Sequence, residues 1–502
     1  MYKKNKAMNK IKNLLWALLV AVPVVMIFSG CKKFLDRKPL TATLDDLNQG
    51  GLEGQIYGLY GAIRNGDVAG QGFGGIPWMA MNNFRSDDSE KGSSAADGAD
   101  WGVIFDEFKY AKDHWAPSIY WDQHYVLIGQ ANVALQTADS LKLTDPASLI
   151  NIGEAKFFRA FAYFDLVRAY GEVPKIDFRI YNPNDAKKPK ATVAAIYALI
   201  DKDLQDAIAV LPSSWPVKFT GRLTNSAAKA LYAKALLYRG QWAQSLAINQ
   251  QIMTGAYSLT SDYSKIFTDA GENNAESIFE IQAYTGPNGT PNLFSWYAIC
   301  QGVRGSGEWD LGWGWNSPTQ ALVDAFPAGD QRKAATILYS GQSDGVYGRV
   351  LPSFPTVPRS FWNKKVYPNP AMQASTGERQ GGWINQRIIR YADVLLMAAE
   401  AANELSGPAN QALAVNYTNQ IRVRAGLAPV VFTDQATMRT IIQNERRYEL
   451  ALEGERFYDL VRWGIAQTVL GGAGYQPCNR YYPIPQAAID FASGVLIQNP
   501  CW

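Results

Sequence analysis

The chain has 502 residues, with 48 basic and 45 acidic side chains and a formal net charge of +3 at pH 7. Residues 1–30 contain five lysines and no arginine or acidic residue, so removing them leaves the remaining chain at −2. Binding to nucleic acid needs a concentrated basic surface. The remaining basic residues are mixed with acidic ones along helical stretches, which excludes that class of function.

The N-terminal segment has the order of a secretory signal. Its five lysines precede an apolar stretch from Leu14 to Phe28, and Ser29 and Gly30 then lead into Cys31. The apolar stretch is shorter than the roughly 20 residues of a spanning helix, and small residues before a cysteine are typical of a bacterial lipobox. We predict a lipoprotein signal peptide over 1–30 and an acylated Cys31 that anchors the protein at a membrane. An ordinary signal peptide is the alternative.

The chain from residue 31 to 502 shows nearly uniform composition and no linker, which predicts one domain. Three cysteines follow Cys31, so at least one of them stays unpaired within the chain. A bridge between Cys478 and Cys501 is one possibility. Their spacing does not suit a metal cluster, and the sequence predicts neither a metal nor a cofactor.

Long segments rich in glycine, proline, asparagine, serine and tryptophan span 50–113 and 255–384. Loops of this length are usually functional. Flat indole rings suit the apolar face of a sugar, while amides and guanidiniums can bind its hydroxyls. Packing alone is the alternative for about half of the rings. The candidate ligand contacts are Trp78, Asn82, Asn83, Arg85, Trp101, Trp296, Trp309, Trp313 and Trp315.

Between these segments, apolar residues at helical spacing predict a mainly α protein. In 154–170, Phe157, Phe161, Phe164 and Val167 share one face, and Gly171 ends the helix. A second helix begins near Asn225, and a third covers 242–253. Further pairs join 391–405 with 411–425, and 435–452 with 455–463. Such helix–turn–helix units suggest tetratricopeptide-like hairpins, although an unrelated helical bundle would show the same periodicity.

Catalytic motifs are weak in this chain. Residues 341–345 fit a Gly-x-Ser-x-Gly pattern, but a hydrolase of that type needs a later histidine, and both histidines come earlier, so we interpret the match as a turn. A glycoside hydrolase that uses Glu308 and Asp310 beside Trp309 is the enzyme alternative. Asp87, Asp88 and Glu90 could form part of a calcium site, although carboxylates in a turn more often cap backbone amides.

The C-terminal part contains a dense run of charges and aromatics from Glu445 to Trp463, followed by Tyr482-Pro483-Ile484-Pro485. The charges recur at helical spacing, so a role in the scaffold is the preferred interpretation. The run closely resembles the C-terminal signature of the SusD/RagB family of Bacteroidetes. The resemblance extends over nearly the whole chain after residue 31 through 83–88, 121–132, 391–404 and 421–427.

This resemblance implies a helical scaffold with long loop excursions and a non-catalytic, cofactor-free function. Family members are surface lipoproteins of the outer membrane. They capture oligosaccharide or polysaccharide and pass it to a SusC-like TonB-dependent transporter, which they cap as a lid. We therefore expect a glycan-binding protein at the cell exterior. A peptide-binding lipoprotein of the same family and a surface adhesin are the alternatives.

Overall fold

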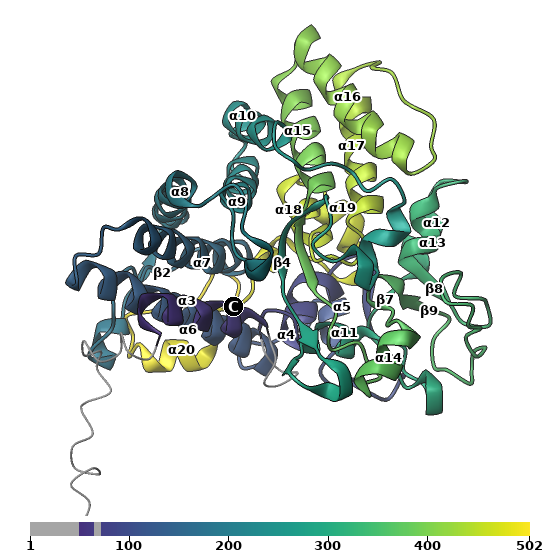
Figure 1. Cartoon of the computed structure of the whole chain (residues 1–502), viewed down its shortest axis with the longest axis horizontal. Coiled ribbons are helices and arrows are strands. Elements are labelled where there is room, and N and C mark those ends of the chain that lie inside the picture. Colours follow the sequence, from purple (N-terminus) through teal and green to yellow (C-terminus); the bar gives the residue numbers. More distant parts are fainter. Residues whose placement is uncertain (1–49, 65–71) are drawn as a thin grey trace, which may run out of the picture. The chain divides into compact units, whose positions relative to one another are not determined.

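The computed structural model describes residues 50–64 and 72–502, and Leu52–Trp502 form one compact unit. Its larger elements are helices, and its strands are short (Figure 1). This confirms the predicted mainly α fold. The predicted signal peptide and Cys31 lie outside the described residues. In the described part of the chain, no helix has the length and apolar character needed to cross a membrane.

The first half of the unit is a series of helix pairs. Consecutive helices α6 to α10 pack against each other, each on the next (Figure 1). The predicted helix 154–170 is the second part of α7, which begins earlier because Asp145 caps it and Pro146 opens it. Thr224, rather than Asn225, caps α9. The helices are α3 Gly51–Arg64, α6 Trp115–Ser140, α7 Pro146–Tyr170, α8 Val193–Val210, α9 Asn225–Leu237 and α10 Trp242–Met253.

The C-terminal helices continue this arrangement. Helix α15 packs against α16 and α17 and also against α10 from the first half (Figure 1). The predicted pair 391–405 with 411–425 is therefore present as α15 and α16. The helices predicted over 435–452 and 455–463 are α17, which ends at Glu449, and α18, which packs against α19. The elements are α15 Tyr391–Leu405, α16 Pro408–Arg424, α17 Gln435–Glu449, α18 Arg456–Arg462, α19 Ala466–Leu470 and α20 Gln486–Phe491.

The prediction of irregular structure was wrong at the start of 50–113, where α3 is a helix of 14 residues with a buried apolar face. Elsewhere the two long segments contain short helices and two-stranded antiparallel sheets. In the described residues the strand pairs are β1–β7, β2–β3, β4–β10, β5–β6 and β8–β9. The short helices are α4 Ile76–Met79, α5 Val103–Asp106, α11 Trp296–Gln301, α12 Gln320–Ala325, α13 Gln331–Thr336 and α14 Pro370–Thr376. The strands are β1 Ser89–Gly92, β2 Val173–Pro174, β3 Lys190–Ala191, β4 Ser277–Ile281, β5 Tyr284–Thr285, β6 Asn292–Leu293, β7 Trp315–Pro318, β8 Ile337–Tyr339, β9 Phe361–Asn363 and β10 Gln386–Arg390.

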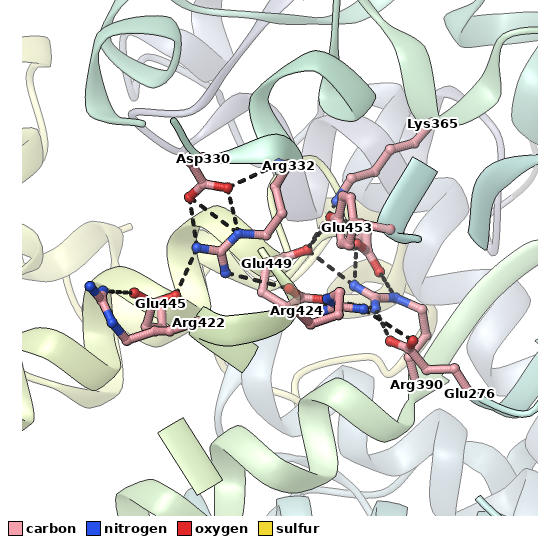
Figure 2. Close-up of polar contacts among 11 residues, drawn as sticks. Glu276, Asp330, Arg332, Lys365, Arg390, Arg422, Arg424, Glu445, Glu449 and Glu453 are labelled. Carbon is pink, nitrogen blue, oxygen red and sulfur yellow. Dashed lines mark hydrogen bonds and ion pairs between the residues drawn. The ribbon is translucent and has the colours of Figure 1, made fainter. Parts of the chain in front are cut away.

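A buried network of ion pairs joins these loops to the helical scaffold (Figure 2). Glu449 lies at its centre, fully buried, with Arg390 3.0 Å and Arg424 2.7 Å away. Arg390 also contacts Glu276 at 2.7 Å and Glu453 at 2.8 Å. The charged run therefore pairs mainly with distant segments rather than along its own helix. Its predicted role in the scaffold is what the structure shows.

Acidic pH should weaken this network. Burial alone would raise the pKa of Glu449, but nearby arginines, of which Arg424 and Arg390 act most strongly, outweigh it and lower the pKa from 4.5 to about 2. The stabilisation is therefore complete above pH about 4.5 and is lost as the pH falls towards about 2. We expect the free energy of unfolding, measured by urea denaturation, to decline across this window. A constant value would contradict the prediction.

A disulfide joins Cys478 to Cys501, with 23 residues of sequence separation, while Cys300 is free and buried. Closing a loop of this length restricts the unfolded chain and stabilises the fold by about 3 kcal/mol. We expect the double variant Cys478→Ala/Cys501→Ala to lose that amount in urea denaturation. The reduced wild-type protein serves as the control and should unfold at the same midpoint. If the double variant and the reduced wild-type protein both unfolded at the midpoint of the oxidised wild type, the prediction would be contradicted.

Candidate functional site

Three partly exposed aromatic rings form a continuous surface in the loop region, here called the aromatic platform: Phe294, Trp296 and Trp313. The ring centroids of Phe294 and Trp296 are 5.6 Å apart, and those of Trp296 and Trp313 are 5.3 Å apart. The planes of the rings tilt by 70° and 50° to each other, so the three rings are in contact but do not form a flat stack. Such a surface can follow consecutive sugar rings.

Glycines bring the two parts of the platform together. Trp296 opens α11, which Ser295 caps through a hydrogen bond from the amide of Tyr297 at 3.2 Å. The amide of Trp313 donates to the carbonyl of Ile299 on that helix at 2.9 Å. A Cβ atom at Gly312 would lie 2.5 Å from the same carbonyl oxygen, so a larger residue could not make this close approach.

Polar side chains lie on the segments that adjoin the platform. Gln380 Nε2 donates to Asp310 Oδ1 at 3.2 Å, three residues before Trp313. Glu378 accepts a hydrogen bond from the amide of Gly382 at 2.9 Å, and a Cβ atom at Gly382 would lie 3.1 Å from Phe294 Cβ. These amide and carboxylate groups can bind sugar hydroxyls at the edge of the rings.

Two of the predicted tryptophans in the glycine-rich segment are buried. Trp309 is 8% exposed, and the Arg349 guanidinium lies 4.1 Å from its ring centroid. Trp315 is 3% exposed and lies in β7, where it contacts Trp101 at 4.9 Å. Both rings therefore contribute to packing, and Trp313 between them is the ring that stays partly exposed.

The remaining predicted tryptophans lie apart from the platform rings. Trp101 is partly exposed and packs against Trp115 at 5.2 Å as well as against Trp315. Trp78 is buried in α4 and contacts Tyr297, with the two ring centroids 5.8 Å apart. Trp101 remains a predicted ligand contact on a second aromatic cluster, while Trp78 packs against α11 through Tyr297.

Asn82, Asn83 and Arg85 form part of the scaffold rather than an exposed rim. Each is at most 3% exposed. Arg85 lies between the rings of Phe457 and Tyr482, 3.7 Å from each centroid. Asn83 Oδ1 accepts a hydrogen bond from the amide of Gly454 at 3.0 Å. A ligand could reach these three side chains only if the chain opened, so we assign them to the contact with the C-terminal signature.

The neighbouring acids have the same role. Asp87 lies 2.8 Å from Arg456 and 2.9 Å from Arg447, and Asp88 lies 2.6 Å from Arg447. Arginines therefore pair with Asp87 and Asp88, and the third predicted calcium ligand, Glu90, pairs with Arg359. Within the described residues, no group of three or more histidine, cysteine, aspartate or glutamate side chains could hold a metal ion.

The two carboxylates of the hydrolase alternative have different surroundings. Glu308 is exposed and lies 3.8 Å from Arg349, and Asp310 accepts the hydrogen bond from Gln380. The Gly-x-Ser-x-Gly match is a turn, as predicted: Asp344 accepts hydrogen bonds from the three following amides of 346–348 at 3.0 Å each. His124, one of the two histidines that precede this match in the chain, is buried next to Asp165.

Sequence reasoning missed Phe294, although a signal was present. Phe294, Trp296 and Tyr297 lie close together directly before an apolar helical turn. Neighbouring side chains at the start of a helix point to different sides of that helix, so some of these rings face the core and others face solvent. Here Tyr297 is buried, while Phe294 and Trp296 stay partly exposed.

Comparison with known proteins gives consistent matches. Residues 266–502 match the family described as SusD family, and residues 69–237 match the family described as starch-binding associating with outer membrane. SusD-like protein P2 of Formosa agariphila is 30% identical, over 89% of this chain and 92% of its own length. Starch-binding protein SusD of Bacteroides thetaiotaomicron is 25% identical, over 75% and 78%.

Solved structures share the fold. A laminarin binding SusD-like protein aligns with a TM-score of 0.74 and 28% identity, over 90% of this chain and 99% of that protein. Surface glycan-binding protein A from Bacteroides thetaiotaomicron, solved in complex with laminarihexaose, aligns with a TM-score of 0.73 and 24% identity, over 89% and 98%.

Proposed function

The chain belongs to the SusD family, and from that premise we propose that it captures a glycan at the bacterial outer membrane on its aromatic platform. The observation that carries the proposal is the pair of partly exposed rings Trp296 and Trp313, 5.3 Å apart and extended by Phe294. Tryptophan rings bind the C–H face of a pyranose, and neighbouring polar groups bind its hydroxyls.

Members of this family bind carbohydrate and do not cleave it, so the chain is a binding protein rather than an enzyme. The relatives also suggest the first ligand to test. A structural relative is named for laminarin binding and another was solved with laminarihexaose. We take laminarin as the leading candidate and starch as the second, since the matched family and a relative are named for starch.

The remaining parts of the proposal concern the assembly. The mature chain begins at Cys31, whose acyl chains hold a single domain of residues 31–502 at the cell surface. A SusC-like TonB-dependent transporter receives the glycan. Binding a flexible sugar costs ordering entropy, so modest affinity is expected, and tethering next to the transporter raises the effective concentration.

Affinity electrophoresis tests the binding step. Residues 32–502 are run through native gels that contain laminarin, starch, or one of several plant, fungal and host polysaccharides, with reducing-end release measured in parallel. Retardation without product supports the proposal and names the glycan. Product formation would contradict it in favour of a hydrolase that uses Glu308 and Asp310. No retardation in any gel would contradict it in favour of peptide binding or adhesion.

A further inference from the structure

A cavity of about 750 Å³ lies in the helical scaffold and shares no residue with the aromatic platform. It is formed where the end of α7, the start of α8, the end of α9 and helix α18 meet the segment before Tyr482. Ligand pockets typically measure about 300–1,000 Å³, so the volume suits a small molecule or one to three sugar units. Its lining residues are Val167, Arg168, Val193, Ala194, Tyr197, Tyr238, Arg239, Tyr458, Val461, Arg462, Trp463, Gly464, Arg480 and Tyr481.

The lining has a distinctive composition: four arginines, five aromatic rings and no acidic residue. Three of the arginines are held by carboxylates that do not line the cavity. Arg168 pairs with Asp165 at 2.5 Å. Arg239 pairs with Asp201 at 2.6 Å. Arg462 donates to Glu400 at 2.8 Å. These pairs fix the guanidiniums in place, which lowers the entropy lost when a ligand binds.

The fourth arginine differs from the others. Arg480 is exposed, and within residues 50–64 and 72–502 no carboxylate lies within ion-pair distance of it. Its guanidinium is 5.1 Å from the ring centroid of Tyr481, which also lines the cavity. A guanidinium presents several N–H donors in a plane and binds a carboxylate or sulfate through paired hydrogen bonds. Arg480 is therefore available to an anion from solution.

We propose that this cavity is a second carbohydrate site, which binds an acidic sugar unit: a pyranose that carries a carboxylate or a sulfate ester. The aromatic rings provide the surface for the pyranose, the tyrosine hydroxyls can bind its hydroxyl groups, and Arg480 binds the anionic group. An acidic sugar gains an ion pair with Arg480 that a neutral sugar cannot form, so the site favours the charged unit.

Two other cavities of the described chain do not combine these features. A cavity of about 590 Å³ beside α16 is lined by amides and hydroxyls, and its one arginine, Arg424, is engaged by Glu276 and Glu449. A cavity of about 270 Å³ beside α20 is mainly apolar, with Asp122 and Lys188 as its charged residues. Of these three cavities, the arginine-lined one is suited to an anionic sugar.

The test uses residues 32–502, which contain the whole compact unit, and three monosaccharide probes: glucuronic acid, glucose 6-sulfate and neutral glucose. Binding is measured by ligand-observed saturation-transfer NMR and by titration of tryptophan fluorescence, since Trp463 lines the cavity. The variants are Arg480→Gln and the platform variant Trp296→Ala/Trp313→Ala. Arg179→Gln is the matched control, because Arg179 also lies over a tyrosine ring, Tyr181, away from this cavity.

We expect an acidic probe to bind at least about tenfold more tightly than glucose, and Arg480→Gln to remove that difference. The platform variant and Arg179→Gln should bind the acidic probe as tightly as the wild type does. Comparing the two acidic probes identifies the preferred group, carboxylate or sulfate. Equal binding of all three probes, an unchanged difference in Arg480→Gln, or loss of acidic-probe binding in the platform variant would each overturn the proposal. Failure of laminarin binding alone would affect only the platform.

Discussion

Replacing Trp296 and Trp313 together by alanine should reduce glycan affinity about a thousandfold, below detection in affinity electrophoresis. Covering a large side chain with a ligand contributes about 2 kcal/mol, so each ring accounts for about thirtyfold in Kd. Both rings are partly exposed in the free protein and also pack against the core, so their loss removes ligand contacts together with some packing. The single variants should therefore show intermediate affinity.

The matched control for this prediction is Trp242→Ala. Trp242 is also partly exposed, but it lies at the start of α10 in the helical scaffold, away from the loops that carry the platform. It should bind glycan as the wild type does. Circular dichroism and thermal unfolding of all variants separate loss of binding from loss of structure. A double variant that unfolds like the wild type and still binds glycan would disprove the platform as the site.

Replacing Arg390 by methionine should cost about 3–5 kcal/mol of the free energy of unfolding, because removing one partner of a buried ion pair leaves uncompensated charge. Arg390 is 2% exposed and lies among Glu276, Glu449 and Glu453 (Figure 2). Methionine keeps much of the side-chain volume, so most of the loss reflects charge rather than a cavity. Urea denaturation measures this loss of unfolding free energy. We also expect the variant to express poorly.

Lys202→Met provides the comparison. Lys202 pairs with Asp206 at 2.8 Å, but its side chain is 70% exposed. Exposed pairs contribute about 0–1 kcal/mol, so this variant should unfold close to the wild type. If Arg390→Met also lost less than about 1 kcal/mol, the network would not be the stabilising element that its burial indicates.

The sequence predicted the helical scaffold well because helical periodicity is a local signal. The face formed by Phe157, Phe161 and Phe164 lies within α7, and 391–405 matches α15 without any change in bounds. The sequence places the start of α7 too late, because residues 146–153 show little apolar periodicity. The signal for the true start is the cap at Asp145.

The candidate site was only partly predictable, because burial in loops depends on distant contacts. Arg85 and Asn83 are polar residues in a glycine-rich region, and only the packing of Phe457 and Gly454 against them makes them part of the core. Composition likewise could not tell which of the alternating rings between Trp309 and Trp315 faces outward. Which ring faces outward depends on how this segment packs against α11, where the amide of Trp313 donates to the carbonyl of Ile299.

The contacts of 83–88 with 447–482 also constrain when the polypeptide can reach its native state. Asp87 pairs with Arg456. The Arg85 guanidinium packs against the ring of Tyr482, which lies nearly four hundred residues later in the chain. Sequence-distant contacts form late, after the loop between them has closed. The early segment therefore cannot complete its native contacts before the last part of the chain is available.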